Sequence, residues 1–307
     1  MHSSKKSHLA KIALLLATII WGSTFFIMEE TIQNIGICSL LAVRFTLAAG
    51  ILALILLKHL RVIDKGYLWR GLVMGVLVIT AYISQTYGLA DEATTPGKNA
   101  FLTAIYCIIV PFLAYPFTKI KPDRYNVVAS FLCIFGITLI SVTGGDFSTI
   151  CKGDILTLLG GIFYSLQMIA VSAFSRGRNI LLLTMLQFLF AGIIAWVPTL
   201  LFETYPTGLS LGGVGAILYL TIFATCLCYI FQNAGQKFTT PSTAALILSL
   251  EAVFGVLFSV IFTGEEISLK MFFGFFLVFL AIIVSEIKPF KVGDVKNVQT
   301  AKGEKDI

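Results

Sequence analysis

Two ionisable side chains, Arg44 and Glu251, stand inside long apolar stretches of the chain. Placing a charge at the centre of a membrane-spanning helix costs about 2.5 to 3.5 kcal/mol on insertion scales, so each is a functional-site hypothesis by default. In the functional interpretation they hold the charged ends of a zwitterionic substrate, or Glu251 carries a coupling proton. In the alternative interpretation, each side chain bonds a neighbouring helix and fixes its packing.

Tyrosine, glutamine and tryptophan side chains in other apolar stretches extend this set, because sites for small metabolites combine aromatic surface with a few polar groups. The candidate substrate-binding residues are Glu251, Tyr106, Arg44, Gln85, Tyr82, Gln232, Tyr229 and Trp21. Tyr164 and Gln167 fall at places that match Trp21, where they line the same cavity or pack in the core. We predict that none of these residues is catalytic.

The remaining reactive residues do not form an enzymatic or metal-binding pattern. The histidines lie in a predicted tail and a loop, at His2, His8 and His59. The sequence has no H-E-x-x-H and no G-x-x-x-x-G-K, and its six cysteines lack metal-ligand or disulfide spacing. We therefore expect no metal, no cofactor and no enzymatic activity. The alternatives are a membrane-embedded enzyme and a carrier of lipid-linked substrates.

The composition sets the class of protein that must position these residues. Hydrophobic residues make up 57% of the 307 residues, charged residues make up 12%, and the mean hydropathy is +0.93. No water-soluble domain keeps so much apolar surface covered, so we predict an all-α integral membrane protein. The net charge of +6 does not indicate nucleic-acid binding, because the basic residues are spread over short loops and tails.

Ten apolar runs approach the roughly 20 residues that a helix needs to cross a bilayer. They are Leu9 to Met28, Ile37 to Leu57, Gly71 to Leu89, Pro96 to Phe117, Tyr125 to Val142, Ile155 to Phe174, Leu181 to Leu201, Leu211 to Ala234, Pro241 to Phe262 and Leu269 to Ile287. Lysine and arginine gather in alternate connections and in both tails, whereas the other connections are mostly acidic. Because basic loops stay in the cytoplasm, we predict a multi-pass plasma-membrane protein with both termini cytoplasmic.

The two halves of the sequence resemble each other. Tyr82-Ile83-Ser84-Gln85 matches Tyr229-Ile230-Phe231-Gln232 at an offset of 147 residues, and Thr94-Thr95-Pro96 matches Thr239-Thr240-Pro241 at an offset of 145. We predict two five-helix repeats, 9–142 and 153–287, between tails 1–8 and 288–307. Five spans is an odd number, so the second repeat is inverted, and inverted repeats let a central cavity open alternately to either side.

Symmetry also relates four of the candidate residues. Tyr82 and Gln85 fall near the outer end of the third run, and Tyr229 and Gln232 fall near the inner end of the eighth. By this symmetry they are expected to gate opposite mouths of the cavity. Alternatively, they anchor helix ends at the membrane surface or form bonds between helices.

Short motifs in both halves carry a family resemblance. The motifs are Trp21-Gly22-Ser23-Thr24-Phe25, Arg44-Phe45, Ala48-Ala49-Gly50, Gln85 to Gly88, Thr94 to Lys98, Phe101-Leu102-Thr103, Pro111, Ala244-Ala245-Leu246, Ser249-Leu250-Glu251, Gly264-Glu265, Gly274 and Ser285-Glu286. In order and spacing the chain resembles the drug/metabolite transporter superfamily, specifically the EamA-type permeases. The resemblance implies ten helices, a cavity between the halves, and gradient-driven transport of amino acids or other small metabolites. Ala252 stands where the family commonly has a proline, which puts a kink there in question.

The scarcity of cations narrows the substrate. Carriers of phosphorylated solutes need cationic side chains in the cavity, but Arg44 is the one cation deep in a run and Lys98 lies two residues into another. We therefore expect a small-molecule substrate such as an amino acid or a similar small metabolite, carried through the lipid bilayer by alternating access. A proton is the candidate coupling ion.

Overall fold

The computed structural model describes residues 2–118, 121–141, 150–203, 210–238 and 241–286, which form helices and connecting turns without a strand. The helices are α1 (His2–Ile32), α2 (Ile37–Ile55), the short η1 (Leu57–Val62), α3 (Lys65–Leu89), α4 (Pro96–Thr103), α5 (Tyr106–Leu113), α6 (Tyr115–Thr118), α7 (Arg124–Ser141), α8 (Lys152–Phe174), α9 (Ile180–Phe202), α10 (Leu211–Tyr219), the π-helical segment Leu220–Leu227, α11 (Cys228–Phe238), α12 (Pro241–Phe262) and α13 (Leu269–Glu286). The all-α class predicted from composition is confirmed.

Within the described residues, seven helices are long and apolar enough to cross a membrane, namely Leu9–Ile32, Ile37–Ile55, Lys65–Leu89, Pro96–Phe117, Lys152–Phe174, Ile180–Phe202 and Leu211–Gln236. Three further helices are apolar over shorter lengths of the described chain, namely Arg124–Ile140, Ile247–Phe262 and Leu269–Ala281. The chain is therefore a multi-pass membrane protein. The predicted tail 288–307 and the matched Thr239-Thr240 lie outside the described residues.

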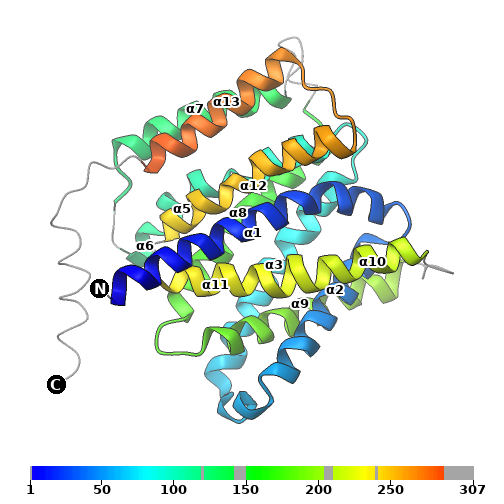
Figure 1. Ribbon diagram of the computed structural model, residues 1–307, viewed down its shortest axis with the longest axis vertical. Helices are drawn as coiled ribbons and strands as arrows, with labels where there is room; N and C mark the ends of the chain where they lie inside the picture. The colour runs from blue at the N-terminus through cyan, green and yellow to red at the C-terminus, as the bar shows by residue number, and fades with distance from the viewer. Residues whose placement is uncertain (1, 119–120, 142–149, 204–209, 239–240, 287–307) are drawn as a thin grey trace.

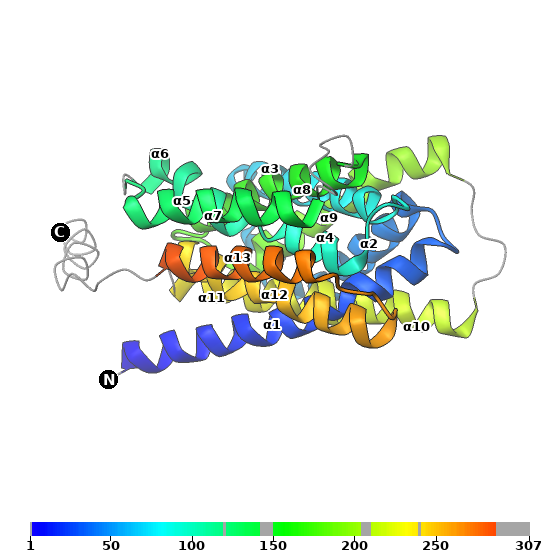
Figure 2. The same cartoon turned by 90° about the horizontal axis from the view of Figure 1, so that it is seen from above.

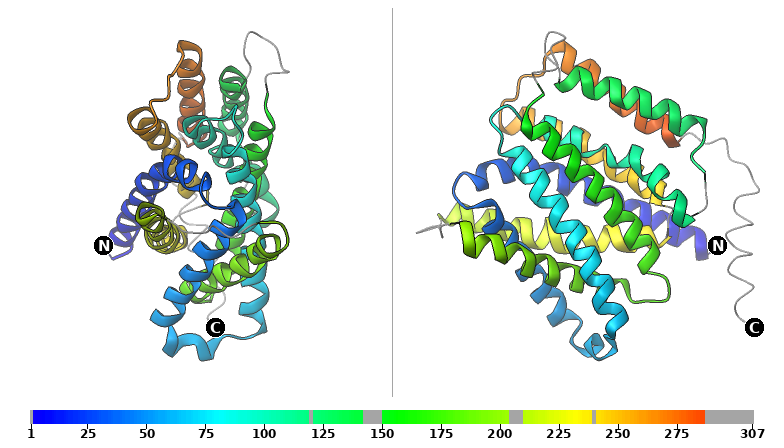
Figure 3. Two further views of the ribbon diagram at one scale, coloured as in Figure 1. Left: turned by 90° about the vertical axis from the view of Figure 1, so that its right-hand side faces the viewer. Right: turned by 180° about the vertical axis from the view of Figure 1, so that it is seen from behind.

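The helices that surround the centre of the molecule form two layers (Figure 3, left). One layer holds α1 between α11 and α12, with which it packs (Figure 1). Seen from above, these three helices lie on the side away from α3 and α8 (Figure 2). The facing layer holds α3, which packs against α8 and α9. Each layer thus combines helices from before residue 142 with helices from after residue 150, so any cavity between the layers is lined by both parts of the chain.

A separate pair, α7 and α13, lies along one edge of the bundle (Figure 1). The two helices cross at Gly136 and Gly274, where a Cβ atom added to Gly136 would lie 2.8 Å from the carbonyl oxygen of Gly274. Small residues of this kind let membrane helices approach closely and gain van der Waals contact.

Two predicted spans are not regular helices. The run from Pro96 is divided into α4, α5 and α6. Between α4 and α5, hydrogen bonds between residues three apart, such as Cys107 N to Ala104 O, replace the four-residue spacing of an α-helix. Inside α5, Pro111 has no N–H to donate. In the run from Leu211, α10 and α11 are joined by the wide π-helical turns of Leu220–Leu227. There Thr225 Oγ1 bonds the carbonyl of Leu220, five residues earlier, at 2.8 Å.

Two further differences concern helix bounds. The first helix begins at His2 rather than near Leu9, because lysine is a good helix former and no glycine or proline interrupts residues 2–8. The predicted tail 1–8 is thus largely a continuation of α1. By contrast, α12 runs through Ala252, where the family commonly has a proline, as one continuous helix from Pro241 to Phe262.

One end of the bundle, which we call the acidic end, carries Asp91, Asp154, Glu203 and Glu265 together with Lys98. Three of these carboxylates accept from amides at the beginnings of other helices. Glu203 accepts from Cys38 N at 2.8 Å and Ser39 N at 2.7 Å, Glu265 accepts from Gly97 N at 3.0 Å, and Asp91 accepts from Gly153 N at 2.9 Å. The fourth, Asp154, forms a buried ion pair with Lys98 at 2.8 Å. All these contacts join the part before residue 142 to the part after residue 150.

At the opposite end, which we call the basic end, two polar contacts between the described residues join the same two parts of the chain. Arg178 donates to Asp64 at 2.9 Å, in a pair whose side chains are 24% and 59% exposed. Asn179 N donates to the Tyr67 hydroxyl at 2.8 Å. The Tyr67 amide and the Arg178 guanidinium hold the pKa of Asp64 below its usual 3.8.

Candidate functional site

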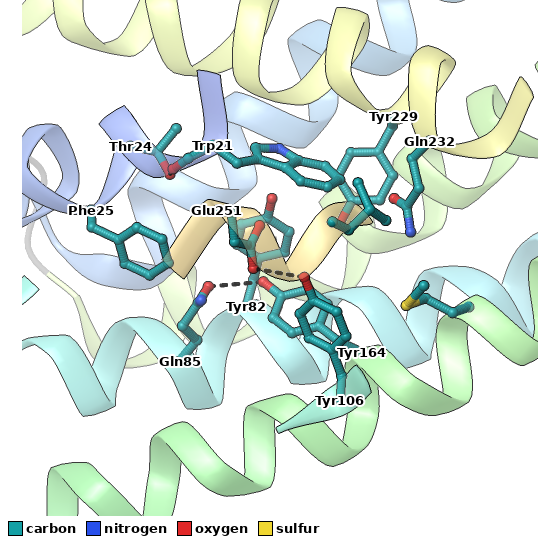
Figure 4. Close-up of a pocket in the computed structure, with 12 residues that line it drawn as sticks. Trp21, Thr24, Phe25, Tyr82, Gln85, Tyr106, Tyr164, Tyr229, Gln232 and Glu251 are labelled. Atoms are coloured by element: carbon teal, nitrogen blue, oxygen red, sulfur yellow. Dashed lines mark hydrogen bonds between the residues drawn. The ribbon is translucent and has the colours of Figure 1, made fainter. Parts of the chain in front are cut away.

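A cavity of about 460 Å³ lies between the two layers of helices (Figure 4). Its lining residues are Trp21, Thr24 and Phe25 of α1, Tyr82 and Gln85 of α3, Tyr106 of α5, Tyr164 and Met168 of α8, Tyr229 and Gln232 of α11, and Leu248 and Glu251 of α12. All but one of these helices contribute residues three or four positions apart, which is the spacing that places side chains on one helix face. The cavity therefore draws one face of each of six helices into a single site.

Glu251 supplies the carboxyl group of the cavity. It is 6% exposed, and its Oε1 accepts a hydrogen bond of 3.3 Å from the Tyr106 hydroxyl (Figure 4). Neither ion pair among the described residues includes it. A carboxylate that is buried without a cation is costly, so this position favours a ligand that brings a positive charge or a proton.

Aromatic rings surround this carboxyl group. The Tyr82 ring lies edge-on to that of Tyr164 with centroids 5.5 Å apart, and it lies 6.4 Å from that of Tyr229. Trp21 packs edge-on against Tyr229 at 5.3 Å and donates its indole N–H to the Ala224 carbonyl at 2.7 Å. That carbonyl lies within the π-helical segment, so the irregular turn helps to fix the Trp21 ring beside the cavity.

The two glutamines of the cavity have different surroundings. Gln85 donates to Thr103 Oγ1 at 2.9 Å and accepts from the Tyr164 hydroxyl at 2.9 Å. Gln232 donates to Gln167 Oε1 across a longer 3.4 Å, and its own Oε1 has no hydrogen-bond partner in the described part of the chain. The polar capacity of Gln85 is thus engaged, whereas Gln232 keeps an acceptor for a ligand or for water.

Seven of the eight candidate residues predicted from the sequence line this cavity, and Arg44 does not. Arg44 is 1% exposed and donates to Thr225 Oγ1, to the Tyr82 hydroxyl at 3.2 Å and to Met28 Sδ at 3.7 Å. Its guanidinium also lies 4.7 Å from the centroid of the Tyr82 ring. These contacts place it behind Tyr82, as the packing interpretation of this residue would have it.

The pairs Tyr82 with Gln85 and Tyr229 with Gln232 were expected at opposite mouths, but the structure brings all four to the same cavity. Lys98, the other cation considered for the site, is paired with Asp154 outside it. Tyr164 lines the cavity as the sequence suggested, and Gln167 lies behind Gln232.

Sequence reasoning missed four lining residues, which are Thr24, Phe25, Met168 and Leu248. Each stands three or four positions from a candidate or from a residue considered with the candidates, namely Trp21, Tyr164 and Glu251. A search three and four positions to either side of each such residue would have identified them, because residues at that spacing share a helix face.

Comparison with known proteins places this fold and cavity in a family. The sequence model of the EamA-like transporter family matches residues 8–142 and again residues 151–286. An uncharacterized transporter of Archaeoglobus fulgidus is 31% identical over 280 residues, covering 91% of this chain and 86% of that protein. The uncharacterized inner membrane transporter YedA of Escherichia coli is 25% identical over 267 residues, with 83% of each chain covered.

A solved crystal structure has a similar fold, with a TM-score of 0.66 at 15% identity over 90% of this chain and 96% of that chain. At that identity the likeness concerns the fold alone. The two family matches together span nearly all of the described residues, and the Archaeoglobus fulgidus relative is similar over almost its full length. The chain belongs to the EamA-like transporter family.

Proposed function

We propose that the protein is a secondary transporter that moves a small amino-group-bearing metabolite, such as an amino acid or an amine, across the plasma membrane by alternating access. The observation that carries this proposal is the cavity between the two helix layers, which both parts of the chain line and which holds the single carboxyl group of Glu251. A buried site of this kind binds a small solute away from both membrane surfaces.

The proposed architecture is ten spans in two inverted repeats, 9–142 and 153–287. Its support is the double match of the family model and the presence of helices from both parts in each layer. With five spans in each repeat, the second enters the membrane from the opposite face, and the lysine and arginine bias places both termini in the cytoplasm. The basic end is then cytoplasmic.

In this proposal the structure is a state closed at the acidic end. The carboxylate bonds at the beginnings of α2, α4 and α8 hold the two parts together there, and the basic end has fewer contacts of this kind. Transport then requires these acidic-end bonds to break while the basic end closes around the cavity.

The test uses the full chain reconstituted in vesicles, with uptake and efflux of a panel of labelled amino acids and amines. We expect flux well above that of empty vesicles, and we expect Glu251→Gln to abolish it while the thermal unfolding midpoint stays close to the parent's. If Glu251 serves packing alone, Glu251→Gln stays active and Glu251→Leu loses stability. A stable and fully active Glu251→Leu protein would remove Glu251 from the substrate site.

Cysteine labelling tests the orientation. Single cysteines in the loop 58–65 and in the loop 91–95 are exposed in turn to an impermeant thiol reagent on intact cells. We expect labelling in the second loop alone. Labelling confined to the first loop would reverse the proposed orientation.

A further inference from the structure

The charge balance of the cavity is one-sided. Among its twelve lining residues are one carboxyl group and no lysine or arginine. The charge of Arg44 lies behind Tyr82, where its guanidinium donates to Thr225, Met28 and Tyr82 rather than to a group in the cavity. Lys98 is paired with Asp154. A ligand carboxylate entering this cavity would leave water and find no cationic donor among the lining residues to replace its hydration.

The aromatic rings add to this preference. Trp21 lies edge to face with Tyr229 and Tyr82 lies edge to face with Tyr164, while the tilted pair of Tyr82 and Tyr229 joins them, with centroids 5.3 to 6.4 Å apart. All four rings line the cavity together with Glu251. The faces of such rings attract cations, and desolvation strengthens the attraction. A ring cluster around one carboxyl group is the chemistry that recognises ammonium groups.

From this arrangement we propose that the cavity binds a compact organic cation, an amine or quaternary ammonium compound without a carboxylate, rather than a zwitterionic amino acid. This inference rests on the proposed transport function and narrows it. Glu251 pairs with the ammonium charge, the aromatic faces surround its alkyl groups, and the unpartnered Oε1 of Gln232 accepts from an N–H or O–H of the ligand. Side chains from six helices line the cavity and leave room for a compact cation alone.

The test compares pairs of molecules that differ in the carboxylate. Choline is paired with glycine betaine, phenethylamine with phenylalanine, and isobutylamine with valine. Binding to the purified full chain is measured by calorimetry, and flux is measured in vesicles. In at least one pair we expect the cation to bind about tenfold or more tightly than its carboxylated counterpart, because the counterpart adds an unpaired buried charge.

Variants of Glu251 and Tyr229 separate the contribution of the carboxyl group from that of the aromatic rings. Glu251→Gln should abolish binding of the preferred cation. Tyr229→Phe keeps the ring and should bind nearly as the parent does, whereas Tyr229→Leu removes the ring and should bind about threefold to tenfold more weakly. A thermal unfolding scan of each variant checks that it is folded. Equal binding by the folded Leu and Phe variants would overturn the role of the rings.

The outcomes separate a failure of the organic-cation proposal from a failure of the proposed transport function. If the carboxylated member is preferred in every pair and is transported, the cation class is wrong and the transport function stands. If none of the six compounds binds but a neutral solute is carried, the same conclusion follows. If the folded protein moves no solute faster than empty vesicles do, the proposed transport function fails as well.

Discussion

At the acidic end, Glu203, Glu265 and Asp91 bond the first amides of helices that belong to the other part of the chain, and Lys98 pairs with a buried Asp154. At the basic end, the ion pair between the parts is Arg178 with Asp64, and both side chains meet solvent. The same two parts of the chain are therefore joined at both ends by charged groups, but in very different surroundings.

The two ends differ in how far their charged groups are removed from water and in whether those groups contact the beginning of a helix. Hydrogen bonds from amides to carboxylates are about twice as strong as neutral ones, and a carboxylate at a helix beginning also meets the positive end of the helix dipole. Exposed ion pairs contribute little because water and salt screen them. We infer that the contacts at the acidic end hold the two parts of the chain together more firmly than those at the basic end.

The two cavity glutamines repeat this contrast on a smaller scale. Gln85, toward the acidic end of α3, has both ends of its amide engaged, while Gln232 of α11 keeps one acceptor without a partner. The hydrogen-bonding groups of Gln85 thus have more partners than those of Gln232. Each prediction below tests one step of this comparison.

The largest expected effect concerns Lys98. Lys98→Met would leave Asp154, whose side chain is 1% exposed, without its cation and with no hydrogen-bond partner at Oδ2. An unpaired buried charge of this kind typically costs about 3 to 5 kcal/mol of stability. We expect a correspondingly large fall in the thermal unfolding midpoint of the purified protein.

The double variant Lys98→Met with Asp154→Leu is the matched control, because it removes the stranded charge along with its partner. It should recover most of the lost stability. Arg178→Met supplies the same comparison at the basic end and should leave the midpoint nearly unchanged. If Lys98→Met and Arg178→Met lowered the unfolding midpoint equally, the proposed difference between the acidic end and the basic end would be wrong.

The next effect concerns Glu265, which accepts from Gly97 N at 3.0 Å, from Ser259 Oγ at 2.5 Å and from the Thr95 hydroxyl. Glu265→Gln removes the charge and one acceptor oxygen, so we expect a loss of about 1 to 3 kcal/mol in unfolding free energy. Its neighbour Glu266 is exposed, and Glu266→Gln should have no measurable effect. A matching loss in Glu266→Gln would show that overall charge, rather than the helix cap, matters.

A feature of the fold or of the site could be predicted from the sequence when the residues that determine it lie close together along the chain. Glu251 and Tyr106 were named as candidates because they are polar residues inside apolar runs, which is a local pattern. The partner of Glu203 could not be found in this way, because Cys38 and Ser39 lie 165 and 164 residues away and no motif links them. Only folding brings such residues together.

The same reasoning applies to Arg44, which does not line the cavity. An arginine inside an apolar run is unusual in any sequence, but whether it points into the cavity depends on Thr225, which lies 181 residues away. The π-helical segment that presents Thr225 has the composition of an ordinary apolar helix. The helix breaks in the predicted fourth and eighth spans were missed for this reason, while the spans themselves were found.

A smaller effect separates the two glutamines. Gln85→Leu leaves the Tyr164 hydroxyl without its acceptor and Thr103 without a donor, so we expect a loss of about 1 to 2 kcal/mol in unfolding free energy. Gln232→Leu removes one long bond and an unpartnered acceptor, so it should cost less or be neutral. The measurement is chemical or thermal unfolding of both variants in one detergent. A larger loss for Gln232→Leu would reverse the order of the two sides.

The smallest effect belongs to Asp64, at the basic end. Its pKa is held below the usual 3.8 by the Tyr67 amide and by Arg178, so ionised Asp64 favours the folded state. That contribution is fully present above the unfolded pKa and is lost as the pH falls below about 3.8, through the lower folded pKa. Asn is also a good residue at the beginning of a helix, so Asp64→Asn keeps the cap to Tyr67 and removes the charge alone. We expect the parent and Asp64→Asn to differ slightly in unfolding midpoint at neutral pH, and we expect this difference to shrink in high salt and to vanish in strong acid. A difference at neutral pH as large as that of Lys98→Met would mean that the exposed pair holds the basic end closed as firmly as the buried pair holds the acidic end.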